Sequence, residues 1–177
     1  MSDNKGKDGE LKTTIILSAA AIREDGLEVM RPTSTNQSDL GADIILKGKR
    51  NTFKKLFKIA SAVVPNNDNE PNNNNDDEIA EARIDVKATK EKLTGDTVDK
   101  FASDVRKHPN TDTHILLGGK GLTKSAQNKL NEHVDAFKTS GKNLVYISNA
   151  GLEKIARHYK SEIKGVLPND NQQDEEE

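Results

Sequence analysis

The feature that most constrains the fold is an unbroken alternation of apolar and polar residues across Glu81–Thr89. A period of two predicts a β-strand with one face packed in a core. The apolar positions are Ala82, Ile84, Val86 and Ala88. Asp85 and Lys87 are two residues apart, so their side chains share the opposite face. Two interpretations follow: an ion pair on a solvated face, or a carboxylate that holds a divalent cation beside a lysine.

Apolar periodicity predicts further elements on both sides of this strand. The expected strands cover residues 27–31, 41–46, 81–89, 113–117 and 143–147. The expected helices cover residues 10–25, 47–64, 122–138 and 151–163, with one more after Thr94-Gly95-Asp96. This order predicts an α/β fold in which helices flank both faces of a mixed central sheet.

The first expected helix has one apolar face and a polar segment before it. The apolar face consists of Leu11, Ile15, Ile16, Ala19, Ala20 and Ile22. Gly26 follows at a position suited to ending the helix. Met1–Gly9 contains little to bury, so we expect residues 1–9 to form a disordered leader.

Composition predicts one folded domain with polar segments attached. Only 32% of the residues are hydrophobic and 3% are aromatic, which is too few for the whole chain to pack. We expect the domain at residues 10–164, with an insertion at about 47–80 whose centre, Asn66–Glu78, is an Asn-rich loop. Residues 165–177 are predicted to be an acidic disordered tail.

Charge is unevenly distributed between these parts. Asn66–Glu78 and Pro168–Glu177 each contain five acidic residues and no Lys or Arg. Removing these ten acids from the 29 leaves 19 against 27 basic residues, an excess of eight positive charges. A folded part with this positive charge is consistent with a polyanionic partner. It is equally consistent with charges that only keep the surface soluble.

One segment concentrates the positive charge. Six basic residues and no acid occur between positions 47 and 58: Lys47, Lys49, Arg50, Lys54, Lys55 and Lys58. The apolar residues between them predict a basic amphipathic helix. It either contacts nucleic acid or packs on the body with its lysines in solvent. Lys90, after the central strand, is a further candidate contact to a phosphate backbone.

Several functional classes are disfavoured. The chain has no cysteine, which excludes disulfides and thiolate zinc sites and fits a cytoplasmic protein. No apolar run approaches membrane-spanning length, so we expect no membrane association. The loop Gly118–Gly121 fails the P-loop pattern and predicts a tight strand-to-helix turn. The four histidines are dispersed without metal-ligand spacing.

Asp43 adds a second carboxylate to the polar pair of the central strand. It begins the expected strand 41–46, which precedes the central strand along the chain. If the two strands are neighbours, Asp43 and Asp85 come within reach of one hard cation. Such a cation polarises a phosphate and lowers the pKa of bound water, while the Lys87 ammonium orients that water or stabilises developing charge.

The motifs occur in a recognisable order. After the first helix come Gly26-Leu27-Glu28-Val29, then Ser38–Ile45, then Ile84-Asp85-Val86-Lys87. Thr113–Gly118 with Gly121–Ala126, and Asn143–Ile147 with Gly151–Ile155, follow. This series resembles the PD-(D/E)xK nuclease superfamily and, more narrowly, its Mrr-like restriction endonuclease branch. Ala42 stands at the place of the family's proline.

The resemblance implies a restriction-endonuclease-like fold and a metal-dependent endonuclease acting on DNA. Asp43 and Asp85 would bind Mg²⁺ (or Mn²⁺), and Lys87 would be the catalytic lysine. An acid on the first helix is also expected, but neither Glu10 nor Glu24 falls at the expected place. A homodimer is considered as the assembly.

Two alternatives stay open. One is a structure-selective or RNA-directed nuclease of the same superfamily, such as a junction resolvase or a toxin domain. The other is a nucleic-acid-binding or interaction module that keeps the fold without cutting.

Overall fold

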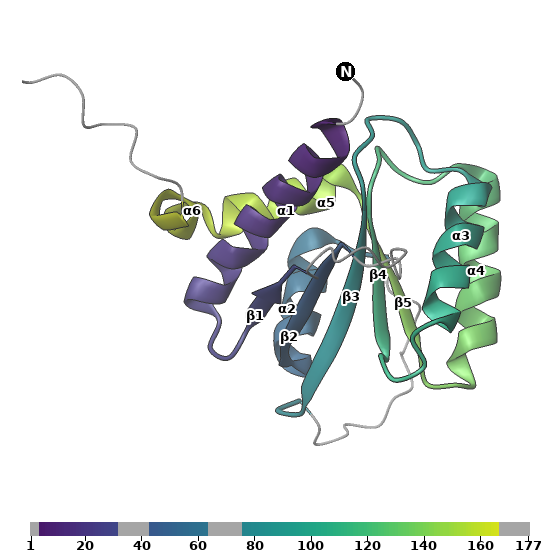
Figure 1. The fold of residues 1–177 in the computed structure, drawn as a ribbon, viewed down its shortest axis with the longest axis horizontal. Helices are drawn as coiled ribbons and strands as arrows, with labels where there is room; N and C mark the ends of the chain where they lie inside the picture. Colours follow the sequence, from purple (N-terminus) through teal and green to yellow (C-terminus); the bar gives the residue numbers. More distant parts are fainter. Residues whose placement is uncertain (1–3, 32–42, 64–75, 167–177) are drawn as a thin grey trace, which may run out of the picture.

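The computed structural model describes residues 4–31, 43–63 and 76–166, and five strands of this part form one sheet (Figure 1). In spatial order they are β1 (Glu28–Met30), β2 (Ile44–Lys49), β3 (Ile79–Lys87), β4 (Thr113–Gly118) and β5 (Asn143–Ile147). β1, β2 and β3 pair antiparallel, whereas β3, β4 and β5 pair parallel. The mixed α/β sheet expected from the sequence is therefore confirmed.

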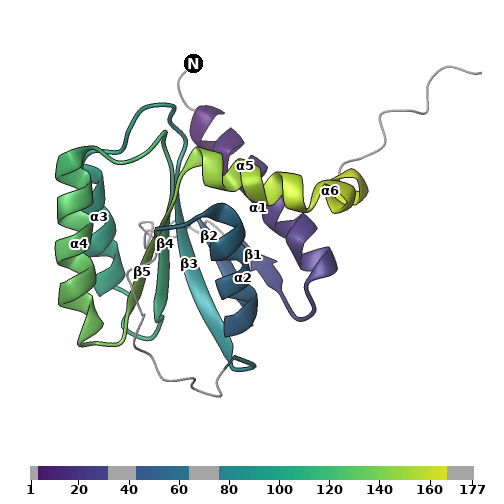
Figure 2. The ribbon, with the colours of Figure 1, turned by 180° about the vertical axis from the view of Figure 1, so that it is seen from behind.

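Helices cover both faces of this sheet, as Figures 1 and 2 show from opposite sides. They are α1 (Asn4–Arg23), α2 (Arg50–Ala60), α3 (Gly95–Arg106), α4 (Lys124–Lys138), α5 (Asn149–His158) and α6 (Lys160–Val166). α1, α2 and α5 enclose a larger core with the sheet, and α3 and α4 enclose a smaller core on the opposite face. Every residue of β4 is buried because helices pack on both of its faces.

Helix α1 begins at Asn4, earlier than expected, so the disordered leader is wrong for residues 4–9. The early turns pass close to the end of β3: a Cβ added at Gly9 would lie 2.7 Å from the Cβ of Ala88. This close approach favours glycine despite its poor helix propensity, because tertiary packing outweighs intrinsic preference. Residues 1–3 lie outside the described part.

The buried face of α1 matches the predicted one at Ile16, Ala19 and Ala20 but not at its two ends. Leu11 and Ile22 are 50% and 61% exposed, so their predicted inward orientation is wrong. The buried stripe instead runs through Thr13, Ile16, Leu17 and Ala20, at the spacing i, i+3, i+4 and i+7. Thr13 is tolerated there because its hydroxyl donates a hydrogen bond to the Gly9 carbonyl, 2.8 Å away.

The segment expected as an insertion at about 47–80 begins with ordered elements, and its basic part is helical as predicted. Residues 47–49 belong to β2, and residues 50–60 form α2, which buries Phe53, Leu56 and Ala60 in the larger core. Beyond α2, Val63 forms an antiparallel bridge to Tyr146 on β5. β3 begins at Ile79. Residues 64–75 and 167–177, with most of the Asn-rich loop and the acidic tail, lie outside the described part.

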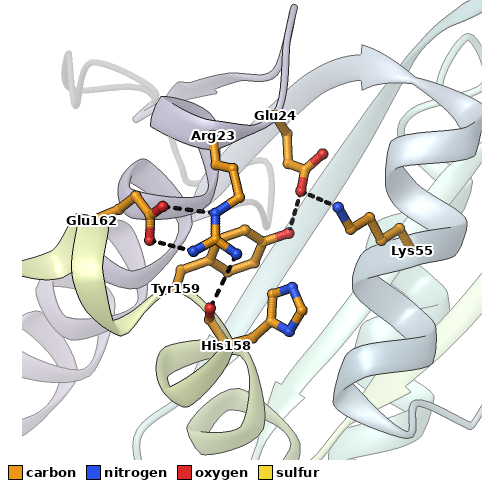
Figure 3. Close-up of polar contacts among 6 residues, drawn as sticks. All are labelled: Arg23, Glu24, Lys55, His158, Tyr159 and Glu162. Atoms are coloured by element: carbon orange, nitrogen blue, oxygen red, sulfur yellow. Dashed lines mark hydrogen bonds and ion pairs between the residues drawn. The ribbon is translucent and has the colours of Figure 1, made fainter.

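The last expected helix is divided into α5 and α6 at Tyr159. Tyr159 is fully buried, and its hydroxyl donates to Glu24 at the end of α1, 2.8 Å away (Figure 3). Lys55 of α2 donates to the same Glu24 oxygen at 2.5 Å. One carboxylate thus joins α1, α2 and the α5–α6 junction.

A second pair of residues attaches α6 to α1. Arg23 donates two hydrogen bonds to the carboxylate of Glu162, at 2.7 and 2.9 Å. Its guanidinium lies 5.0 Å from the centroid of the Tyr159 ring and also donates to the His158 carbonyl (Figure 3). The planar guanidinium suits this combination of bidentate pairing and stacking, so the short α6 is held against α1 although none of its residues is buried.

The glycine loop forms the expected tight turn between β4 and α4. Gly118 has φ +132° and pairs in register with Lys87, whose carbonyl oxygen lies 2.1 Å from where a Cβ would be. Thr123 caps α4 by accepting a hydrogen bond from the Ala126 N–H at 3.1 Å. Because Gly118 has no side chain, the backbone of β4 can approach the backbone of β3 closely at Lys87.

Gly118→Ala should lower the free energy of unfolding by more than about 2 kcal/mol, since an alanine must clash with the Lys87 carbonyl and adopt a strained φ. Gly121→Ala is the matched control in the same loop, where a Cβ meets nothing within 4 Å. It should change stability by no more than about 0.5 kcal/mol. Urea unfolding of both variants measures the difference, and equal stability would contradict the account of Gly118.

Candidate functional site

Asp43 lies where β2 begins and is bound to the backbone of β3. Its N–H donates to the Ile84 carbonyl at 2.9 Å, and its Oδ2 accepts from the Val86 N–H at 2.7 Å. Ile44 pairs with Ile84 in register, and both are buried in the larger core. Asp43 itself precedes the strand, but its carboxylate accepts from the residue next to Asp85, and the Asp85 charge contributes to raising the pKa of Asp43. The expected adjacency of these two residues is present.

Asp85 and Lys87 form an ion pair on that face. The Lys87 Nζ lies 2.9 Å from the Asp85 Oδ1. Asp85 is 6% exposed and pairs in register with Leu116, a member of the smaller core beneath α3 and α4. Lys87 is only partly buried, with 29% of its side chain exposed. The ion-pair interpretation is therefore present in the structure, and the same pair places a lysine beside a buried carboxylate, as the metal-site interpretation requires.

Both carboxyl groups are held in surroundings that disfavour their charge. Burial, aided by the carboxylates of Asp85 and Glu10, raises the pKa of Asp43 to about 6, although the Val86 N–H and Lys87 act against this rise. Burial also raises the pKa of Asp85, against the opposing effect of Lys87. A positive charge placed between the two carboxylates would relieve both effects.

Glu10 is an acid near the site to which the sequence assigned no role. It lies on α1, close enough to Asp43 to raise the pKa of that carboxyl, and it accepts a hydrogen bond from Arg31 at 2.8 Å. The sequence placed the start of the helix at Glu10. The only available signal was the neighbouring Gly9, whose contact with Ala88 brings α1 across the end of β3.

The donor set fits a hard cation that keeps much of its water. Asp43 Oδ1 and Asp85 Oδ2 have no hydrogen-bond donor among the described residues. These residues contain no group of three or more His, Cys, Asp or Glu side chains that could hold a metal. Mg²⁺ commonly binds through one or two carboxylates, with waters and substrate phosphates as its other ligands. Asp43 and Asp85 are therefore compatible with Mg²⁺ or Mn²⁺ in that mode only.

Most of the basic residues at positions 47–58 form ion pairs with acidic side chains. The ion pairs are Lys49–Asp77 at 3.7 Å, Arg50–Glu78 at 2.9 Å, Arg50–Asp112 at 2.5 Å, Lys54–Asp76 at 2.7 Å and Lys55–Glu24 at 2.5 Å. Exposed pairs of this kind contribute little to stability, but they reduce the positive field of α2. Lys47, Lys58 and Lys90 are exposed.

The structure does not bring α2 to the face that carries Asp85. The buried residues of α2 belong to the larger core, whereas Asp85 faces the smaller core. Lys47 pairs in register with Glu81, so it shares the face of Asp85, and Lys90 lies in the loop after β3. A nucleic acid at Asp85 would therefore meet Lys47 and Lys90 more readily than Lys54, Lys55 or Lys58.

No protein-family model matches the sequence, and the searches of curated proteins and of solved structures returned no match. The resemblance to the nuclease superfamily therefore rests on the motifs and the geometry given above. In the described part of the chain, no helix has both the length and the apolar character needed to cross a membrane.

Asp43→Asn should stabilise the metal-free protein at neutral pH. The folded state keeps the Asp43 proton up to about pH 6, whereas the ordinary value is 3.8, so the folded state binds more protons between these values and wild-type stability falls as pH rises. This difference corresponds to roughly 3 kcal/mol, at about 1.4 kcal/mol per pKa unit. Asparagine removes the charge and keeps an acceptor for the Val86 N–H.

Urea unfolding in EDTA at pH 4, 5, 6 and 7.5 measures this effect. The variant should exceed the wild type by about 1–3 kcal/mol at pH 7.5 and by much less at pH 4. Equal or lower stability of the variant at pH 7.5 would show that the buried charge is already compensated.

Proposed function

We propose that this chain is a metal-dependent endonuclease that hydrolyses phosphodiester bonds in DNA, with a restriction-endonuclease-like fold. The observation that carries the proposal is that the Asp43 carboxylate is held at the Val86 N–H, next to Asp85, with the Lys87 ammonium 2.9 Å from Asp85. Two carboxylates beside a lysine supply the groups that could hold a divalent cation and stabilise charge in phosphodiester hydrolysis.

Asp43 Oδ1 and Asp85 Oδ2 would hold Mg²⁺ or Mn²⁺. A cation bound there supplies polarisation of the phosphate and a water of lowered pKa. The Val86 N–H fixes the orientation of the Asp43 carboxylate, so the ligand is prepared before binding. Lys87 can donate a hydrogen bond to the attacking water or to a phosphate oxygen, and its charge stabilises the negative charge that develops.

A non-catalytic nucleic-acid-binding module is the second candidate. It is favoured by the ion pair that occupies Asp85, and by the lack of a third metal-ligating side chain in the described ranges. A structure-selective or RNA-directed nuclease remains an alternative for the substrate. A cytoplasmic location and a homodimer also belong to the proposal.

Purified protein should cleave DNA in Mg²⁺ or Mn²⁺ and not in EDTA. Asp85→Asn and Lys87→Gln should each lower the cleavage rate at least about 100-fold, because each removes a group that acts on the developing charge. Lys58→Gln is the matched control, since it removes one exposed charge on α2, behind the sheet. The substrates to be tested are circular duplex DNA, linear duplex DNA, single-stranded DNA, four-way-junction DNA and RNA.

The results separate the candidates. Cleavage confined to junctions or to RNA would transfer the function to the corresponding nuclease class. Binding to these substrates without cleavage in either metal would support the non-catalytic module. Cleavage that survives Asp85→Asn would contradict the assigned site.

A further inference from the structure

Arg83 lies on β3 beside the candidate site, and no role has been assigned to it so far. It precedes Asp85 by two residues, so its side chain emerges on the same face of the strand. It pairs in register with Ile45 on one side and His114 on the other. Arg83 is half-buried, yet its guanidinium has no hydrogen-bond acceptor and no ion-pair partner among the described residues.

Arg50 provides a direct comparison within the same chain. It is half-buried too, but it donates to Glu78 at 2.9 Å and to Asp112 at 2.5 Å. These partners raise the pKa of Arg50 despite its burial. Burial instead lowers the pKa of Arg83 and the charge of Glu81 opposes this effect, but no ion pair joins the two among the described residues. A half-desolvated guanidinium without an acceptor is unfavourable, and an anion would offset that cost.

Among the described residues, no helix covers Arg83 on the side of β2 and β1. The described helices that pack against these two strands are α1 and α2, and both lie on the opposite face. Met30 and Lys47, which share the face of Arg83, are exposed. Ligand atoms can therefore reach the guanidinium across the sheet.

Arg83, Asp85 and Lys87 form a row along one strand. Alternate residues of a strand are about 6.6 Å apart, at roughly 3.3 Å per residue. A phosphate bound at Asp85 would thus have Lys87 on one side and the five N–H donors of Arg83 on the other. The guanidinium is the side chain best suited to holding a phosphate through two parallel hydrogen bonds.

We propose that Arg83 binds a backbone phosphate of the nucleic acid, next to the phosphate held at Asp43 and Asp85, so that the bound strand follows β3. This inference rests on the proposed function for the identity of the ligand, but it requires binding and not cleavage. Arg83 is a positioning residue: it fixes the register of the strand and reads no base.

The test measures affinity for a fluorescent DNA duplex, a single strand and a four-way junction in EDTA, over a series of salt concentrations. Arg83→Gln should weaken binding about tenfold for whichever probe the wild type binds best. The slope of log affinity against log salt should fall by about 0.7–0.9, the loss expected for one phosphate contact. Arg83→Lys should keep the slope and lose only part of the affinity, because it retains the charge but not the bidentate geometry.

Two further measurements exclude a purely structural role. Lys54→Gln removes one charge from α2, behind the sheet, and should leave the salt slope unchanged. Arg83→Gln should be at least as stable as the wild type in urea, because it removes a charge that has no partner among the described residues. A marked loss of stability or failure to fold would overturn the inference by showing that Arg83 supports the structure.

The outcomes distinguish this inference from the proposed function. Unchanged affinity and slope in Arg83→Gln, in a protein that binds and cleaves, would overturn the role of Arg83 alone. Weakened binding in a protein that never cleaves would support Arg83 and contradict the nuclease. Lack of binding by the wild type to every probe would overturn both.

Discussion

The pairing of β3 on both of its edges is the constraint on which the structure depends. Its residues form an antiparallel ladder with β2 and a parallel ladder with β4, so a shift of one residue would break both. The side-chain period of two then fixes which residues enter each core. Ile84 is buried against α1, α2 and α5, and Asp85 is turned toward α3 and α4. The position of every polar group at the site follows from this register.

The same register concentrates unfavourable charge at one end of the strand. Burial raises the pKa values of Asp43 and Asp85 and lowers that of Arg83, so each group is pushed toward its neutral form. The arrangement elsewhere is different: Glu24 receives hydrogen bonds from both Lys55 and Tyr159, and Arg23 is paired with Glu162. Strain of this kind is typical of sites that a ligand completes.

Local periodicity was sufficient to predict the elements that lie deep in the sheet. β5 has the bounds expected from the sequence, and the helix expected after Thr94-Gly95-Asp96 is α3, which buries Val98, Phe101, Ala102 and Val105 at the spacing i, i+3, i+4 and i+7. The adjacency of Asp43 and Asp85 was predictable too, because consecutive strands usually pair. The start of α1 was not predictable from the sequence, since it depends on a contact between Gly9 and Ala88, almost eighty positions later.

The charge partners and the helix faces were also beyond prediction from the sequence. An amphipathic pattern shows that α2 has a buried side, but it does not show which face of the sheet α2 covers. For this reason the sequence did not show that the basic segment and Asp85 lie on opposite faces of the sheet. Arg83 and Arg50 look alike in the sequence, and only the three-dimensional arrangement shows that Arg50 has two carboxylate partners.

The bridge between Val63 and Tyr146 has a consequence for association between copies of the chain. Both backbone groups of Tyr146 are used: its N–H donates to Val63 at 3.1 Å, and its carbonyl accepts from the Val63 N–H at 2.9 Å. An exposed sheet edge is a template on which a second chain can add a strand, and a short covering segment is one way in which proteins block it. β1, at the other edge, has only three residues. In the described part of the chain, both sheet edges therefore offer only short stretches of backbone to a second molecule, which disfavours a continuous intermolecular sheet.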